Sequence, residues 1–250
     1  MITDKEPDVR IPLRIQTQPD DVTCGPTSLH AVYRHFGLDL DLHRVIDSVD
    51  FLEDGGTLAV FLGLDALRRG FDATLITYNL RMFDPTWEHL SPEMLIEKLK
   101  AQLTYKKGKK FTEATHAYLR FLESGGQIRF DILNRSLLVH HLSEGSPILT
   151  GLSATFLYRS SREYTNHRNQ SVYDDLKGEP MGHFVVVYGV EGRHAYVADP
   201  YRENPISHDN YYRVRLGRLI NAIMLGIITY DSNLLILRRR RPYEEDHRHQ

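Results

Sequence analysis

The chain has 250 residues, of which 41% are hydrophobic and 26% charged, a composition typical of soluble globular proteins. Its net charge of −2 argues against a dedicated nucleic-acid surface, which usually makes a domain strongly basic. A single cysteine excludes an internal disulfide, and the charged N-terminus has no apolar signal-peptide core, so we expect a cytoplasmic protein. The longest apolar stretch, residues 219–230, is too short to span a bilayer.

The first half of the chain is predicted to be mainly helical. After Cys24, apolar residues recur with helical spacing, Pro26 suits the first helical position, and Gly37 supplies the stop. Further helices are predicted over about 42–49, from an N-cap at Thr57 to near Gly70, from Ser91, from near Thr112 to Gly125, and from Asn134 to about Ser143. Strands are predicted at 71–77, 127–133 and 146–152.

The second half is predicted to form an antiparallel sheet. The β-rich runs 183–190 and 193–199 are separated by Glu191-Gly192, a hairpin signal, and a last strand is expected at 233–239 after a short helix over 215–226. Helices followed by a sheet predict an α+β fold. Between the halves, residues 160–182 are polar and lack periodicity. We expect this long loop to be a mobile cover over a functional cleft.

The only cysteine, Cys24, stands directly before Gly-Pro at the opening of the first predicted helix. A lone free cysteine is most often a small buried hydrophobe, whereas an activated nucleophile requires a partner base. Unpaired N–H groups at a helix N-terminus favour a thiolate, and the N–H of Cys24 itself can stabilise an oxyanion. The amide of a nearby glutamine can supply a second donor; Gln18 is the first candidate and Gln16 the alternative.

Among thirteen histidines, His183 is the candidate base because it opens the most apolar strand directly after a glycine and the long loop. If the chain turns at Glu191-Gly192, His183 falls opposite residue 199 or 200, and residue 199 is aspartate. Opposed residues of an antiparallel pair share a face, so Asp199 can accept the imidazole Nδ1–H and orient the ring. The alternatives are a structural histidine at a strand end and a turn-forming Asp-Pro.

The segments around these residues resemble a known family. "QTQPDDVTCGPTSL" and "GHFVVVYGV…AYVADP" are similar to the two signature segments of the bacteriocin-processing type of papain-like cysteine peptidase. They resemble more closely its stand-alone relatives, the peptidase C39-like proteins. The resemblance implies a papain-like fold with Cys24 as nucleophile, His183 as base, Asp199 as orienting group and Gln18 as oxyanion donor.

The chain also departs from the family pattern. Transporter-linked members commonly have Asp before the cysteine, where this chain has Thr23, and they cut leader peptides after Gly-Gly as part of a membrane exporter. This chain has no membrane or ATPase segment, so that substrate is not carried over. We expect one peptidase domain over residues 1–241, with an insertion at about 78–130, followed by a polar tail at 242–250.

The sequence therefore predicts a cysteine peptidase that hydrolyses a peptide or isopeptide bond through an acyl-enzyme intermediate. An acyl-transferring enzyme with the same site, or an inactive module that only binds a peptide, are the alternatives. No Cys/His cluster has zinc spacing and no Gly-rich phosphate loop is present, so we expect no metal or cofactor. The expected partner is a peptide or protein substrate, with neither nucleic acid nor membrane.

Overall fold

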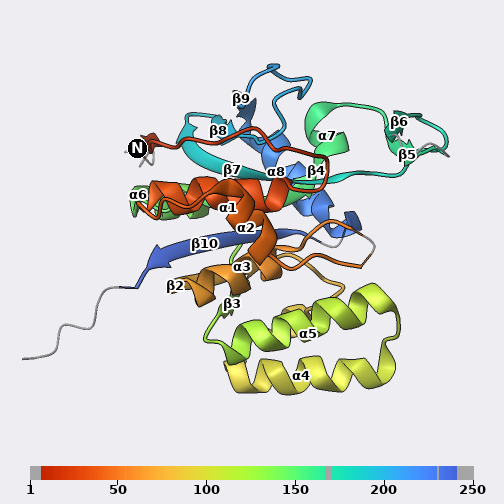
Figure 1. Ribbon diagram of the computed structural model, residues 1–250. Helices are drawn as coiled ribbons and strands as arrows, with labels where there is room; N and C mark the ends of the chain where they lie inside the picture. Colours follow the sequence, from red (N-terminus) through yellow and green to blue (C-terminus); the bar gives the residue numbers. More distant parts are fainter. Residues whose placement is uncertain (1–6, 54, 167–170, 230, 241–250) are drawn as a thin grey trace, which may run out of the picture.

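A single mixed sheet organises the fold. The computed structural model describes residues 7–53, 55–166, 171–229 and 231–240 (Figure 1). Within them, the main sheet has eight strands in the order β3-β2-β10-β4-β7-β8-β9, and β1 pairs with β7. All its pairs are antiparallel except β2 with β3. The strands of this sheet are β1 (Val9–Arg10), β2 (Phe71–Thr77), β3 (Gln127–Arg129), β4 (Ile148–Ser153), β7 (Gly182–Glu191), β8 (His194–Ala198), β9 (Tyr211–Arg215) and β10 (Asn233–Arg239).

Helices cover both faces of this sheet (Figure 1). The helical segments are α1 (Cys24–His35), α2 (Leu42–Ser48), α3 (Ala59–Arg68), η1 (Pro85–Trp87), α4 (Pro92–Tyr105), α5 (Lys109–Glu123), α6 (Arg135–Ser143), α7 (Ala154–Tyr158), α8 (Leu216–Leu225) and η2 (Gly226–Thr229).

Two hydrophobic cores lie on opposite faces of the sheet, and β7 contributes to both. Phe184 and Val186 join the core that contains apolar residues of α1, α3 and α5. Val185 and Val187 join the core that contains those of α6 and α8. Because side chains alternate along a strand, a strand buried on both faces reads as a continuous apolar run. The α+β class is thus confirmed, with a mostly antiparallel sheet that also takes β2, β3 and β4 from the first half of the chain.

Helix starts with a local signal lie where the sequence predicts them. The hydroxyl of Ser91 accepts a hydrogen bond from Met94 N at the start of α4, and the Asn134 side chain accepts one from Leu137 N at the start of α6. The predicted N-cap at Thr57 is wrong, because α3 begins at Ala59 and the Thr57 hydroxyl donates to Asp50 O instead. The N–H of Ala59, at the start of α3, donates instead to the side chain of Asp231, a residue far along the chain.

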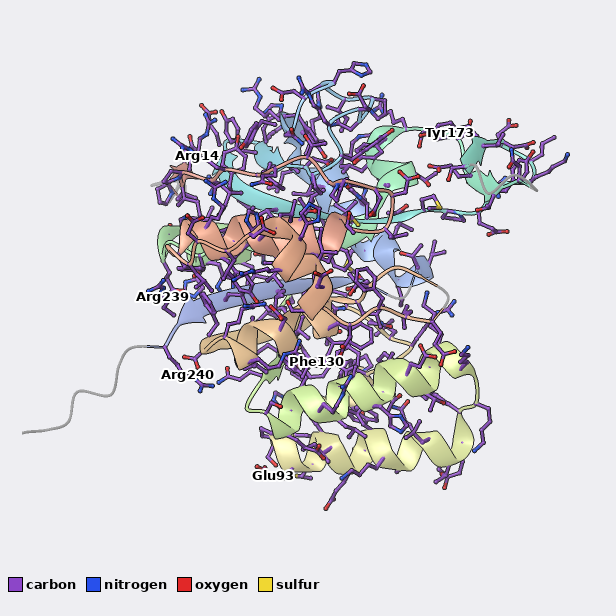
Figure 2. All side chains as sticks on the ribbon, in the orientation of Figure 1. Arg14, Glu93, Phe130, Tyr173, Arg239 and Arg240 are labelled. Carbon is purple, nitrogen blue, oxygen red and sulfur yellow. The ribbon has the colours of Figure 1, made fainter. Side chains whose placement is uncertain are left out.

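Residues 160–182 form more structure than their polarity predicts. They contain β5 (Glu163–Thr165) and β6 (Ser171–Tyr173), which pair with each other in a separate two-stranded sheet. This β5–β6 hairpin projects away from the main sheet (Figure 1), and Tyr173, labelled in Figure 2, lies at its base, where it pairs with Glu163. The structure also adds α7 and β9, which the sequence analysis did not predict. The polar tail at 242–250 lies outside the described residues.

The block at about 78–130 contains α4 and α5, which pack against each other, and α5 also contacts α3 (Figure 1). Helix α5 begins at Lys109, before the predicted start near Thr112, because Gly108 with a φ of 130° ends the preceding segment. Apolar side chains of both helices belong to the α1-side core. Among the described residues, no helix has both the length and the apolarity needed to cross a bilayer.

Candidate active site

Cys24 is the first residue of α1, and its side chain is 9% exposed. The helix is fastened to β7 by the Ser28 hydroxyl, which donates to Phe184 O at 3.2 Å. Glycine at position 25 lets the start of α1 lie close to Thr57 and Phe184. A Cβ at this position would lie 2.4 Å from Thr57 Cγ2 and 3.3 Å from the Phe184 ring. Pro26 is the third helical residue and not, as predicted, the first. The thiol is therefore held at the end of a helix that is locked onto the strand carrying His183.

His183 and Asp199 form a direct buried contact. His183 Nε2 lies 2.8 Å from Asp199 Oδ1, and the two side chains are 8% and 0% exposed. The expectation that Nδ1 meets the carboxylate is wrong. Because Nε2 is used by Asp199, Nδ1 is the ring nitrogen that remains for Cys24, which is close enough to raise the pKa of His183.

The predicted register of this hairpin is also wrong, although the contact it predicted exists. The turn lies at Gly192-Arg193, so Glu191 pairs with His194, and a bulge between Val187 and Gly189 then shifts the register by one residue toward the predicted pairing. Gly192 has a φ of 53°, as the first position of such a two-residue turn requires. As a result, β8 ends at Ala198, and Asp199 reaches His183 from the loop beyond the strand and not from a directly opposed position.

Asp199 accepts hydrogen bonds on both carboxylate oxygens. Oδ1 accepts from His183 and from Tyr201 N at 2.8 Å, while Oδ2 accepts from the hydroxyls of Tyr158 and Tyr212, each at 2.7 Å. Asn210 fixes the backbone of Asp199, through N–H of Asp199 to Asn210 O and Asn210 Nδ2 to Asp199 O. A fully buried carboxylate with four donors is a satisfied anion.

The electrostatics of the pair follow from these contacts. Burial alone lowers the pKa of His183, but the charges of Asp199 and Cys24 and the hydrogen bonds to both raise it to about 10. Burial alone raises the pKa of Asp199, yet His183 and the two tyrosine hydroxyls hold it below its ordinary value. Burial and Asp199 raise the pKa of Tyr158 and Tyr212 well above normal, so both remain neutral donors. The imidazole is therefore protonated near neutral pH.

Gln18 lies in the segment that leads into α1. Its backbone N–H donates to Pro200 O at 2.9 Å, which ties it to the residue after Asp199. Its side-chain Nε2 donates to Asp20 O at 2.7 Å, and the Thr23 hydroxyl donates to the same carbonyl. One of the two Nε2 hydrogens is thus left for another acceptor. Gln16, the alternative, is exposed.

Three residues of the site escaped the sequence analysis: Tyr158, Tyr212 and Asn210. Tyr158 ends α7 and Tyr212 lies in β9, the two elements that were not predicted. Asn210 also accepts a hydrogen bond from the Thr17 hydroxyl at 3.1 Å and so joins the segment of Gln18 to that of Asp199. Among fourteen tyrosines, nothing in the local sequence marks those that contact a carboxylate.

A potential metal-ligand cluster lies elsewhere in the molecule. Within the described residues, the ligand atoms of His140, His141 and Glu144 lie within 4.8 Å of one another at the end of α6. Glu144 is already paired with Arg238, and the positive charge of Arg238 also faces His141. This arrangement disfavours a cation, and we assign no metal to it.

Comparison with known proteins decides the family. The model of the Peptidase_C39 like family matches residues 10–216, most of the chain and all of the site described above. The chain belongs to this family. The resemblance and the expected enzyme class, a cysteine peptidase, are thereby confirmed. No curated protein matches the chain.

Solved structures of similar proteins include several peptidases. A C39-like peptidase from Bacillus anthracis aligns at 15% identity over 95% of this chain and 100% of that one, with a TM-score of 0.46. The peptidase domain of Streptococcus ComA aligns at 15% identity over 91% and 98%, with a TM-score of 0.42. Xylellain, a cysteine protease from Xylella fastidiosa, aligns at 14% identity over 94% and 87%, with a TM-score of 0.41. At these values the assignment rests on the family match.

Proposed function

We propose that the protein hydrolyses peptide or isopeptide bonds, with Cys24 as nucleophile, His183 as acid and base, Asp199 as orienting group and Gln18 as oxyanion donor. The observation that carries this proposal is the buried contact between His183 and Asp199, with Cys24 close enough for its charge to raise the pKa of His183. A merely structural histidine would not need to lie between a cysteine and a carboxylate that accepts hydrogen bonds from two tyrosine hydroxyls.

In the first half of the reaction, the Cys24 thiolate attacks the substrate carbonyl carbon, and the carbonyl electron pair moves to oxygen. The N–H of Cys24 and the free Nε2 hydrogen of Gln18 stabilise this oxyanion. When the intermediate collapses, the C–N bond breaks, and Nδ1 of His183 gives its proton to the leaving amine. A thioester with Cys24 remains.

In the second half, water resolves the thioester. Nδ1 of His183 takes a proton from the water as its oxygen attacks the carbonyl carbon, and the C–S bond then breaks. The acid product leaves, and the thiolate and imidazolium are restored. Asp199 keeps the imidazole in one orientation throughout and stabilises its positive charge, and Tyr158 and Tyr212 hold Asp199 in place.

The test is peptide-library cleavage read by mass spectrometry, combined with iodoacetamide labelling at pH 6.5. We expect the wild type to be labelled faster than free cysteine and to cleave peptides, and Cys24→Ala to lose cleavage by a factor on the order of 10⁴ or more. His183→Ala should lose both the fast labelling and the cleavage. His43→Gln, at an exposed position on α2, should keep the fast labelling and the cleavage.

Three results would contradict the proposal. Labelling at the rate of free cysteine or slower would return Cys24 to the class of small buried hydrophobes. Cleavage that survives in Cys24→Ala would place the chemistry elsewhere. Products joined to an added amine in preference to water would make the protein an acyl-transferring enzyme.

A further inference from the structure

Two adjoining pockets lie beside α7, β9 and the start of α8 and form one arginine groove. The first has a volume of about 540 Å³ and the second about 350 Å³, and they share Arg159, Arg215 and Arg218. The elements concerned lie together in the upper part of Figure 1. Since the pockets share three side chains, they adjoin each other, and we call the two together the arginine groove.

The charge of this groove has one sign. Arg135, Arg193 and Arg213 line it in addition to the shared arginines, and no aspartate or glutamate of the described part of the chain does. Arg135 is paired with Asp8, and Arg213 lies 4.0 Å from Glu191. Among the described residues, Arg159, Arg193 and Arg215 have no carboxylate within 4.0 Å. In a chain whose net charge is −2, such a local excess of cations attracts anions.

The arginines are held in place by the fold. The Arg218 guanidinium donates to Phe156 O at 3.0 Å and lies 5.6 Å from the centroid of the Phe156 ring. Burial and the nearby charge of Arg159 lower the pKa of Arg218, as expected of two cations that face each other. Arg159 directly follows α7 as its C-cap with a φ of 59°, a conformation that glycine usually supplies at a helix end. A bound anion would relieve this repulsion.

The floor of the groove points to a peptide. Leu157, Val214 and Leu216, which are buried, and Ile206 and Ile220 are its apolar lining residues. Strand β9 is the last strand of the sheet, so within the described residues its outer edge has no strand partner. An extended chain that alternates acidic and apolar residues can place carboxylates on the arginines and apolar groups on this floor.

We propose that this arginine groove binds an acidic, extended segment of a polypeptide. Tyr158 lines the second pocket while its hydroxyl donates to Asp199, so the groove reaches the residue that holds the catalytic carboxylate. Under the proposed peptidase function, on which this second part rests, the acidic segment belongs to the substrate and binds away from the bond that is cut. A long nucleic acid suits the groove less well, because the chain as a whole is not basic.

The binding test uses the Cys24→Ala variant, so that no peptide is consumed. A fluorescein-labelled ten-residue peptide that alternates Glu and Val should bind by fluorescence anisotropy and weaken with added salt, and the same peptide with Gln for Glu should not bind. Adding Arg193→Gln and Arg215→Gln should weaken binding by at least about 10-fold. Arg44→Gln with Lys98→Gln, at exposed positions on α2 and α4, removes the same charge and should leave binding unchanged.

A second pair, Arg159→Asn with Arg215→Gln, should give the same loss, because asparagine tolerates the left-handed backbone at position 159. Equal binding of the Glu and Gln peptides, no binding at about 1 mM, or no effect of either groove pair would overturn the proposal. Tighter binding of a single-stranded oligonucleotide that displaces the peptide would also overturn it, in favour of a nucleic-acid site.

The link to catalysis is tested separately on the wild type. For a cleaved peptide extended by an acidic segment, Arg193→Gln with Arg215→Gln should raise KM and leave kcat unchanged. If the wild type binds the peptide without cleaving it, the binding proposal for the arginine groove holds and the peptidase proposal is rejected. If the KM for cleavage is the same with and without the acidic segment, the link between the groove and the substrate is rejected.

Discussion

Asp199 has no exposure to solvent, yet it is surrounded by donors, and this combination determines the charge state of its partner. An isolated buried carboxylate would become neutral, and the histidine beside it would lose the charge that raises its pKa. The hydroxyls of Tyr158 and Tyr212 prevent this, because tyrosines that cannot ionise there can only donate. The protonated state of His183 thus depends on residues that do not contact it through hydrogen bonds.

The alkaline limit of activity should follow His183. Its pKa of about 10 means that the ring keeps the proton needed by the leaving amine up to about pH 9, so turnover should fall only above that pH. Asp199→Asn removes the charge that raises this pKa, so the alkaline limb of kcat/KM should move down by about 1–3 pH units. A pH profile with its limb unmoved in this variant would separate Asp199 from the ionisation of His183.

Tyr212→Phe removes one donor to Asp199 while keeping the ring. The variant should lose about 1.5–3 kcal/mol of folding free energy at pH 7, the value of a hydrogen bond to a charged group. Because the pKa of Asp199 is lowered by folding, this contribution is present above about pH 4 and disappears as the carboxyl is protonated at lower pH.

Urea unfolding at pH 7 and pH 3 measures this difference. Tyr211→Phe, the neighbour in β9 whose hydroxyl bonds to Ile15 N instead, is the matched control. A loss in Tyr212→Phe that is equal at both pH values would mean that the hydroxyl does not stabilise the charged form of Asp199.

Gln18→Ala should lower turnover by roughly 10²–10³-fold and leave iodoacetamide labelling of Cys24 almost unchanged, because an oxyanion donor acts mainly in the transition state. Gln16→Ala, at an exposed position two residues earlier, should change neither turnover nor the labelling of Cys24. Kinetics of both variants on one peptide decide between the two glutamines. A large loss in Gln16→Ala would reverse the assignment, and lost labelling in Gln18→Ala would show that Gln18 shapes the resting site.

At the scale of elements, the β5–β6 hairpin is the segment least integrated into the fold. Its strands pair with each other, and Glu163 forms an additional bridge with Glu179, a few residues before His183. Tyr173 and Leu176 are 57% and 85% exposed, so this segment buries little apolar surface. Burial and the charge of Asp21 raise the pKa of Glu163, which places the base of the hairpin near the segment that precedes Cys24.

Limited proteolysis should therefore cut between Arg162 and Lys177 before any other internal site, because few apolar contacts oppose local opening there. A peptide-like inhibitor bound to Cys24 should slow this cut if the hairpin covers the bound substrate. Mass spectrometry of early tryptic fragments gives the answer. Earlier cutting within the block at 78–130 would make that block the mobile element, and no effect of the inhibitor on either segment would exclude both as covers.

At the scale of the whole molecule, the site is assembled by segments fixed across the sheet. Residues 11–18 run beside β7 and β9, with Ile11 N donating to Tyr188 O and Ile15 N to the Tyr211 hydroxyl. Asp231, just before β10, accepts from Ala59 N at the start of α3 at 2.5 Å and from Asn233 Nδ2 at 2.6 Å. Burial raises the pKa of Asp231 to about 7 despite these donors.

Asp231 should make stability fall as pH rises. Between about pH 4 and pH 7 the unfolded chain has lost the proton of Asp231 that the folded chain still holds, so each unit of pH lowers the stability, up to about 4 kcal/mol in all. Asp231→Asn keeps an acceptor for Ala59 N and has no charge, so it should be more stable than the wild type at pH 8 and flatten this dependence.

Urea midpoints at pH 5 and pH 8 measure the effect, and Asp39→Asn, at an exposed carboxylate, is the control. A destabilised Asp231→Asn at pH 8 would mean that the charged carboxylate is the better cap for α3.

The sequence by itself determined the features that short-range physics controls. Ser91 and Asn134 cap their helices through their own side chains, and the burial of 183–190 on both faces of the sheet follows from a run of apolar residues. It also placed Cys24 at the opening of a helix and His183 at the opening of a strand, and the segments around these residues resemble the family to which the chain belongs.

Only the tertiary structure decided the contacts between distant segments. The register of β7 and β8 left Asp199 beyond the end of β8, and the orientation of the imidazole made Nε2 its contact. The cap of α3 by Asp231 joins residues 172 positions apart, and no local pattern encodes such a pairing. Packing of α7 and β9 against the sheet likewise selected Tyr158 and Tyr212 to hold Asp199, because the free energy of a buried charge depends on every donor around it.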